Sequence, residues 1–352
     1  MITIGVDAHK RVHVALALDE AGREISQWQG PNSSVGWRQM RLWAESTGIT
    51  REWGIEGAWG YGRGLAQHLV AAGDTVYEVN PRWTALGRRS ARRPGKTDRL
   101  DARAVALLVR QESSALPAVQ PEDQTAVLDL LTTERDSALA EATRLRNQIH
   151  ALLVQLDPEY HARLPTLKSR AGLAALETYA SLGVDSLSLA RAATVRRLAQ
   201  RLRLALSQAE DLASQIKRAA AAFSVLTRLC GVNLLTAGAL AGVLGPGRRF
   251  QTDAQLASYA GAAPLEASSA GLVRHRLNRG GNRRLNAILY RIVLTQAHHS
   301  EEARAYLDRR VAQGKTKREA MRALKRYIAR AIWRLWQECC SIGFAPRAAL
   351  VA

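Results

Sequence analysis

Short apolar runs separated by turn residues fill the first part of the chain. This pattern predicts strands at residues 2–7, 12–18, 23–28, 52–56 and 75–79. The first three are closely spaced and should pair as antiparallel hairpins. The pattern also predicts helices at residues 35–46, at 57–72 and from residue 80 to the basic loop that follows. Three antiparallel strands followed by strand, helix, strand and helix is the order of an α/β ribonuclease H-like domain.

The rest of the chain is mostly helical in pattern. Residues 123–156 carry apolar positions in rows that repeat every seven residues, broken once by Arg135, and residues 195–222 are a second such stretch. Heptad rows predict a coiled-coil arm, within one chain or between two chains. Residues 229–240 are equally compatible with a helix-hairpin-helix and a plain helical hairpin. Later helices are expected at residues 254–259, with Asp253 as the cap, and at 282–298, 301–313 and 315–339.

Four carboxylates fall where these elements should converge. Asp7 ends the first strand and Glu56 the fourth, while Asp98 and Asp101 lie three positions apart in the first turn of a helix. Parallel strand ends lie side by side, and residues at i and i+3 project from one side of a helix. Thr97 or Asp98 as an ordinary N-cap explains the helix start equally well. Four converging acids instead favour a site for Mg²⁺, with Mn²⁺ as a substitute.

Charge points to a polyanionic partner. The 352 residues include 50 Lys and Arg against 31 Asp and Glu, a formal net charge of +19. Such an excess is typical of nucleic-acid binding, and a membrane surface is the competing explanation. No apolar run reaches transmembrane length and no signal peptide pattern opens the sequence, so we expect a cytoplasmic protein without membrane association, bound to the bacterial nucleoid when active.

Two basic segments are the predicted nucleic-acid contacts. The first precedes the Asp98 helix and the second follows a loop with two adjacent serines, Ser268 and Ser269. The predicted contact residues are Arg88, Arg89, Arg92, Arg93, Lys96, Arg274, Arg276, Arg279, Arg283 and Arg284. Arginines around a phosphate would favour a serine alkoxide and neutralise charge on phosphorus, so one serine is a candidate nucleophile. A polar loop with helix caps is the alternative.

Several motifs in order resemble one known family. They are Gly5-Val6-Asp7-Ala8-His9-Lys10, Ile55-Glu56-Gly57 with Tyr61-Gly62, Val79-Asn80-Pro81, Lys96-Thr97-Asp98-Arg99-Leu100-Asp101-Ala102, Tyr259-Ala260-Gly261-Ala262-Ala263-Pro264 and the serine loop with Arg274-His275-Arg276-Leu277-Asn278-Arg279-Gly280-Gly281-Asn282. Together they resemble the DEDD transposases of the insertion-sequence-110 family, which includes Piv-like invertases. The chain differs in having Ala270 where glycine is frequent.

The resemblance implies more than the residues alone. It implies an N-terminal RuvC-like domain whose catalytic, metal-binding set falls on Asp7, Glu56, Asp98 and Asp101. It also implies a catalytic serine that attacks the DNA phosphate, here Ser269 in preference to Ser268, and a noncoding bridge RNA that pairs with donor and target DNA. Base pairing would then select the sequence while the protein holds the duplex backbone.

The expected fold is therefore α/β plus α. Residues 1–111 would form the RuvC-like catalytic domain, 112–222 a linker and coiled-coil arm, and 223–352 a mainly helical transposase domain with the serine loop. The expected activity is RNA-guided cutting and rejoining of DNA by a homodimer or homotetramer. The alternatives are a RuvC-like metal-dependent nuclease in which the serine is incidental, and a non-enzymatic architectural protein.

Overall fold

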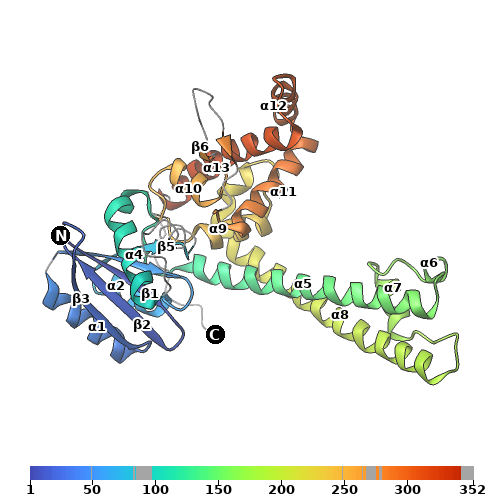
Figure 1. Cartoon of the computed structure of the whole chain (residues 1–352). Helices are drawn as coiled ribbons and strands as arrows, with labels where there is room; N and C mark the ends of the chain where they lie inside the picture. Colours follow the sequence, from blue (N-terminus) through green and yellow to red (C-terminus); the bar gives the residue numbers. More distant parts are fainter. Residues whose placement is uncertain are drawn as a thin grey trace. The chain divides into compact units, whose positions relative to one another are not determined.

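The computed structural model describes residues 1–48, 50–81, 84, 97–247, 249–263, 265, 266, 275, 276 and 280–341. The chain divides into two compact units. One comprises Met1–Thr125, Val225–Asn233 and Val243–Ala352, and the other Ala126–Ser224 and Leu234–Gly242. The sheet and the C-terminal helices belong to the first unit, and the two long helices form most of the second (Figure 1).

A five-stranded mixed sheet organises the N-terminal part. Its strands are β1 (Ile2–Ala8), β2 (Val12–Leu18), β3 (Glu24–Pro31), β4 (Arg51–Glu56) and β5 (Thr75–Val79). The strand order is β3-β2-β1-β4-β5, with β1-β2 and β2-β3 antiparallel and β1-β4 and β4-β5 parallel. The predicted strands and the ribonuclease H-like α/β order of this part are confirmed.

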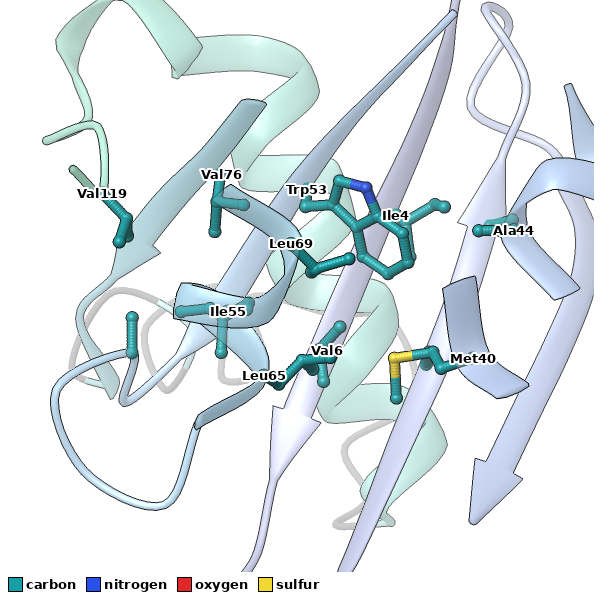
Figure 2. Close-up of a cluster of buried hydrophobic side chains, with 14 residues drawn as sticks. Ile4, Val6, Met40, Ala44, Trp53, Ile55, Leu65, Leu69, Val76 and Val119 are labelled. Atoms are coloured by element: carbon teal, nitrogen blue, oxygen red, sulfur yellow. The ribbon is translucent and has the colours of Figure 1, made fainter. Parts of the chain in front are cut away.

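Helices cover both faces of this sheet. They are α1 (Ser34–Thr47), α2 (Arg63–Ala71) and α4 (Asp98–Glu112). Even-numbered β1 residues such as Ile4 and Val6 point toward α1 and α2, where they pack with Met40 and Leu65 (Figure 2). Odd-numbered β1 residues face α4, because successive side chains of a strand alternate between faces. Removing each large side chain of this core from water contributes about 1.5–3 kcal/mol to folding.

The helix α2 begins later than the sequence pattern predicts. Residues 57–62 form a turn in which the carbonyl oxygen of Gly57 accepts hydrogen bonds from the backbone N–H groups of Gly60 at 2.8 Å and Gly62 at 3.2 Å. Gly57 has a φ of +70°, a conformation that glycine adopts without strain. This tight turn therefore follows Glu56 directly and delays the helix to Arg63.

Residues after α4 pack onto the sheet domain. A 3₁₀ turn at Ser113–Ala115 is followed by a segment beside β5, where the N–H of Glu78 donates to the carbonyl of Pro117 at 2.9 Å and that of Val119 to Val76 at 2.8 Å. Tyr77 and Ala118 form an isolated antiparallel bridge. The segment predicted as a linker thus adds a short paired stretch to the outer edge of β5.

The C-terminal part of the first unit is mainly helical. Its elements are α10 (Asp253–Tyr259), β6 (Leu265–Glu266), β7 (His275–Arg276), α11 (Arg283–His299), α12 (Glu301–Ala312) and α13 (Lys317–Ser341). The four predicted helices are confirmed within two residues at each end. The predicted cap of α10 was wrong: Thr252 is the N-cap and accepts a hydrogen bond from Gln255, whereas Asp253 lies in the first turn and pairs with Arg330.

The second unit is built on two long helices. They are α5 (Gln124–Leu156) and α8 (Ser186–Ala219), with the short α6 (Tyr160–Arg163) and α7 (Arg170–Glu177) between them in sequence. Residues of all four helices share one apolar cluster that includes Leu145, Tyr160, Leu176 and Leu202. The two predicted long helices are confirmed, although α8 begins at Ser186, before the predicted residue 195. The coiled-coil geometry stays a prediction, and α6 and α7 were not predicted.

The remaining elements are a 3₁₀ segment at Ala220–Arg228 and α9 (Leu234–Leu244). The segment contains a kink at Phe223, and Gly231, with a φ of +88°, makes the turn before α9. A 3₁₀ segment, a glycine turn and a helix therefore occupy the stretch for which two kinds of helical hairpin were open. Among the helices of the described ranges, none combines the length and the apolar character needed to cross a membrane.

Candidate functional site

Two of the predicted acids lie next to each other at the carboxyl ends of β1 and β4. Asp7 and Glu56 are register partners in the parallel pairing of these strands. Partners in a parallel pair point to the same face, and the alternation along β1 places Asp7 on the face of Gly5, toward α4. The pairing therefore brings both carboxyl-bearing residues to one end of one face.

Two glycines let α4 lie close against this face. Gly5 and Gly54 are also register partners. A Cβ atom at Gly5 would lie 2.1 Å from the carbonyl oxygen of Ala102 in α4, and one at Gly54 would lie 2.4 Å from Cγ2 of Val109. Any larger residue at Gly5 would collide with the helix backbone. The glycine pair therefore sets the distance between α4 and the strand that ends in Asp7.

The first turn of α4 supplies the other two acids. Thr97 is the N-cap, and its hydroxyl oxygen accepts a hydrogen bond from the N–H of Leu100 at 3.3 Å. The capping interpretation is thus correct for Thr97, and Asp98 and Asp101 lie in the first turn after this cap. Asp101 is 5% exposed, whereas the side chain of Asp98 is 59% exposed. The positive end of the helix dipole stabilises both carboxylates.

Asp7, like Asp101, is a buried acid of this cluster. It is 6% exposed, and burial raises the pKa of its carboxyl group above the usual range. The nearby His9 opposes this rise, while the negative charges of Asp101 and Asp98 add to it. A buried carboxylate beside two others is unfavourable without a neutralising cation. The raised pKa of Asp7 therefore reflects its burial first and then the charges of Asp101 and Asp98, two of the three acids that the sequence grouped with it.

A histidine that the sequence analysis did not single out joins this group. The Nε2 atom of His9 lies 3.1 Å from Oδ2 of Asp7 and 3.4 Å from Oδ1 of Asp98. One ligand atom from each of these three residues lies within 4.8 Å of the others. The Asp-Ala-His spacing at a strand end was the available signal, because it returns a side chain to the face of the first acid.

Glu56 has a partner of its own. The hydroxyl group of Thr84 donates a hydrogen bond to Oε2 of Glu56 at 3.0 Å, and it also lies 2.9 Å from the carbonyl oxygen of Pro81. Thr84 is another residue that the sequence analysis missed. The structure thus groups the ligand atoms of Asp7, His9 and Asp98 tightly, places the charge of Asp101 against Asp7, and holds Glu56 beside them through strand pairing.

These side chains fit a divalent cation. Carboxylate oxygens are hard ligands of the kind that Mg²⁺ and Mn²⁺ prefer. Asp7 Oδ2 is buried and has no hydrogen-bond partner in the described part of the chain. A buried anionic oxygen without a hydrogen bond carries a large desolvation cost, which a bound cation would offset. The residues present therefore suit the metal that an acidic cluster implies.

Most of the predicted nucleic-acid contacts and both serines lie outside the described residues. These are Arg88, Arg89, Arg92, Arg93, Lys96, Ser268, Ser269, Arg274 and Arg279. Of the other three, Arg276 is described only as a backbone position in β7, whereas Arg283 is exposed and Arg284 half-buried at the start of α11. Asn282 caps α11 and accepts a hydrogen bond from the N–H of Leu285 at 3.0 Å.

The segment that enters α11 is fixed at its described end. Gly281 lies so close to Gly261 that a Cβ atom would be 2.2 Å from the Gly261 nitrogen. The side chain of Asn80, just after β5, donates to the carbonyl oxygen of Gly280 at 3.4 Å. Asn282 donates to the hydroxyl of Tyr259 at 2.9 Å. The end of the basic segment is therefore anchored to both α10 and the sheet domain.

A buried arginine extends this anchor to the sheet. Arg249 is 4% exposed, and its Nη2 donates to the carboxylate of Glu78 in β5 and to the hydroxyl of Tyr259 at 3.0 Å. Its Nη1 donates to the carbonyl oxygen of Val243 at 3.0 Å. Trp59, in the turn after Glu56, also donates to Glu78, at 3.0 Å. Polar contacts thus connect the Glu56 turn with the start of α11.

This fold is consistent with an RNase H-like domain, a class whose enzymes act on nucleic-acid phosphodiesters. Family comparison makes the assignment specific. A model of DEDD transposases of IS110 matches residues 4–158, and a model described as the transposase IS116/IS110/IS902 family matches residues 223–308. The chain belongs to the IS110 family of transposases, enzymes that cleave and rejoin DNA. DNA is accordingly its partner, and its N-terminal domain is of a kind that binds divalent metal through acidic residues.

Two curated relatives come from Streptomyces. The chain is 30% identical to the 43.6-kDa protein of insertion element IS110 from Streptomyces coelicolor, over 92% of this chain and 91% of that protein. It is 29% identical to the 44.8-kDa protein of insertion element IS116 from Streptomyces clavuligerus, over 45% of this chain and 39% of the relative. The first similarity extends through both matched domains and the long helices between them.

Proposed function

We propose that this transposase cuts and rejoins DNA with Ser269 as its covalent nucleophile and a Mg²⁺ site formed by Asp7, Glu56, Asp98 and Asp101. The observation that carries the metal part is the meeting of Asp7, Asp98 and Asp101 on one face of the sheet, with a buried Asp7 oxygen that has no hydrogen bond from the described residues. Mn²⁺ would substitute for Mg²⁺, because both accept hard oxygen ligands.

The acids would hold the cation beside the DNA phosphate. When bound, the cation supplies Lewis-acid stabilisation of charge on the phosphate oxygens. The chain's own groups do the rest: Asp7 and Asp101 are fixed by burial, Asp98 faces solvent where a strand can enter, and Thr84 orients Glu56 through its hydrogen bond. This division of buried and exposed acids supports a site that is preformed and open on one side.

The serine step conserves the number of phosphoester bonds. The Ser269 oxygen would bond to phosphorus while the bond from phosphorus to one deoxyribose oxygen breaks, and that sugar hydroxyl leaves with the proton. Attack by the hydroxyl of another strand on the phosphoserine then rejoins DNA and returns the serine. The chain contains no GxxxxGK[ST] phosphate loop, which agrees with a reaction that needs no ATP. Arg283 and Arg284, with Arg274, Arg276 and Arg279, would bind the phosphate.

The guide in this proposal is a noncoding bridge RNA. A net charge of +19 supports binding to both RNA and DNA, and backbone contacts suit a duplex whose sequence is read by base pairing. The first basic segment, Arg88, Arg89, Arg92, Arg93 and Lys96, would contact this backbone. We assign residues 1–111 to the RuvC-like domain, 112–222 to the linker and arm, and 223–352 to the transposase domain.

The arm would hold a homodimer or homotetramer as a coiled coil. In α8 the buried residues Ala192, Val195, Ala199 and Leu202 recur at spacings of three and four, which supports heptad packing between α8 and α5 of one chain. Because the acids and the serine belong to different domains, an oligomer would allow one protomer's acids to serve another's serine.

The test combines the purified protein, RNA transcribed from DNA flanking its gene, labelled donor and target DNA, and Mg²⁺, followed by a denaturing gel. We expect a protein–DNA adduct that requires the RNA and disappears in Ser269→Ala but persists in the matched Ser268→Ala. Asp7→Asn should abolish strand cleavage. Cleavage that continues in Ser269→Ala without any adduct would overturn the serine nucleophile and leave a metal-dependent nuclease. Tight DNA binding with no cleavage under any of these conditions would overturn the enzymatic proposal.

A further inference from the structure

The imidazole of His9 lies between two carboxylates, one buried and one exposed. Its Nε2 atom is 3.1 Å from Oδ2 of Asp7 and 3.4 Å from Oδ1 of Asp98. A nitrogen this close to two carboxylate oxygens lies where one cation can contact all three atoms.

The backbone around His9 is held in place from several sides. The N–H of His9 donates to the carbonyl oxygen of Val12 at 3.1 Å, which closes the turn between β1 and β2. The side-chain amide of Asn32 donates to the carbonyl oxygens of His9 at 3.3 Å, Lys10 at 3.4 Å and Tyr61 at 3.2 Å. Trp37 in turn donates to the Asn32 side-chain oxygen at 2.9 Å. The position of His9 is therefore built into the fold.

The spacing of the three ligand atoms matches one cation. Adjacent ligands of an octahedral ion with bonds of about 2.1 Å lie about 3 Å apart. The His9 nitrogen is 3.1 Å from the Asp7 oxygen and 3.4 Å from the Asp98 oxygen. All three atoms lie within 4.8 Å of one another. A small divalent ion can therefore contact the three together with little rearrangement.

We propose that His9 is a direct nitrogen ligand of the divalent cation, which completes a mixed set with Asp7 and Asp98. The inference rests on the proposed acidic metal site and adds to it a ligand outside the four carboxylates. Imidazole is a softer ligand than carboxylate and suits first-row transition ions. The mixed set accordingly binds Mn²⁺ more tightly, relative to Mg²⁺, than a set of oxygens alone.

The experiment uses the full-length protein with Mn²⁺ as the probe and no nucleic acid. Electron paramagnetic resonance counts free Mn²⁺ for the affinity, and pulsed measurements detect a nitrogen nucleus bonded to the ion. We compare wild type with His9→Ala and with the control His299→Ala, which changes an exposed histidine at the end of α11. His9→Asp replaces the nitrogen by an oxygen. Thermal unfolding checks that each variant is folded.

We expect nitrogen coupling in wild type and in His299→Ala, and its loss in His9→Ala. Because even indirect partners of a metal ligand contribute about 10- to 100-fold to affinity, loss of a direct ligand should weaken Mn²⁺ binding at least about tenfold. His9→Asp should retain binding without nitrogen coupling, with a smaller preference for Mn²⁺ over Mg²⁺. If His9→Ala fails to fold, the wild-type spectrum and His9→Asp still decide the matter.

Two results would overturn the inference, and they have different consequences for the acidic metal site. Mn²⁺ bound by wild type without nitrogen coupling, and equally well by His9→Ala, would remove His9 from the site and leave the carboxylate site intact. Mn²⁺ affinity that is the same in wild type and Asp7→Asn would remove the acidic site itself, and with it the metal part of the proposed function.

Discussion

Replacing Gly5 by alanine should displace α4 and disable the carboxylate cluster. Gly5 lies on the face of β1 that ends in Asp7, and α4 passes over it four residues after Asp98 and directly at Ala102. The new methyl group would point at the backbone of α4 and not at a flexible side chain. Relief must therefore come from movement of the whole helix, which carries Asp98 and Asp101 with it.

The structure sets the size of this movement. The added Cβ atom would lie 2.1 Å from the Ala102 carbonyl oxygen and 2.3 Å from the Ala106 nitrogen, whereas real Cβ atoms essentially never come within 3.0 Å of another heavy atom. The helix must retreat by about 1 Å, and overpacking of this kind costs about 1–3 kcal/mol of stability. A displacement of about 1 Å among reacting groups costs about 100-fold in rate.

The assay measures thermal unfolding, Mn²⁺ affinity and DNA strand cleavage on the same preparations. Gly60→Ala is the matched control, because a Cβ atom there meets only the Gly57 carbonyl oxygen at 3.5 Å. We expect Gly5→Ala to remain folded with a lower melting temperature, to bind Mn²⁺ at least about tenfold more weakly and to cleave about 100-fold more slowly. Gly60→Ala should match wild type in all three measurements.

A folded Gly5→Ala protein with wild-type Mn²⁺ affinity and cleavage would refute the reasoning. It would mean that the distance between α4 and β1 does not set the geometry of the acids. Gly54→Ala provides an independent measurement, because its Cβ atom would meet the side chains of Val109 at 2.4 Å and Val105 at 2.9 Å, which can rotate. Its effects should have the same direction and be smaller.

Three other predictions concern stability. Arg249→Met should lower the free energy of unfolding by about 3–5 kcal/mol, because it leaves the carboxylate of Glu78 without the cation of its buried pair. Chemical denaturation measures this loss, and it should show little change for the exposed control Arg203→Met. Burial lowers the pKa of His13 below its usual 6.5. As the pH falls through 6.5, His13 is therefore protonated in the unfolded chain while it stays neutral in the folded chain. Stability should therefore drop on acidification below pH 6.5, and the melting temperature of His13→Val should drop less; an equal drop in both proteins would contradict this. Thr97→Ala should lower the free energy of unfolding by about 1 kcal/mol through loss of the helix cap, measured by denaturation. An unchanged free energy of unfolding would show that other contacts hold the first turn of α4.

The sheet and the long helices could be predicted because the hydrophobic pattern of each strand or helix lies within one continuous stretch of sequence. Strands β1, β2 and β5 follow from short apolar runs between turn residues, and α5 follows from apolar rows at heptad spacing. The strand order then placed Asp7 beside Glu56, which the register confirms. Local pattern combined with a known strand order was therefore enough to group most of the acids.

The features that the sequence did not predict depend on contacts between distant residues, or on which of two adjacent residues caps a helix. Arg249 and Glu78 are 171 residues apart, and the sequence around neither residue predicts their ion pair. His9 meets Asp98 only because α4 begins beside the end of β1, and its sequence pattern equally suits a surface residue. At the start of α10, Thr252 and Asp253 are both good caps; Thr252 caps the helix, and Asp253 forms an ion pair with Arg330.

The segment after α4 has a consequence for the solubility of the sheet domain. Strand β5 is the last strand of its sheet, and an uncovered last strand offers its N–H and C=O groups to other chains. Pro117 and Val119 occupy such groups on Glu78 and Val76, and Leu116 and Val119 are themselves buried in the domain. A fragment that ends at residue 111 would therefore lose this protection and tend to aggregate edge to edge, whereas one that continues to residue 122 would keep its β5 edge closed.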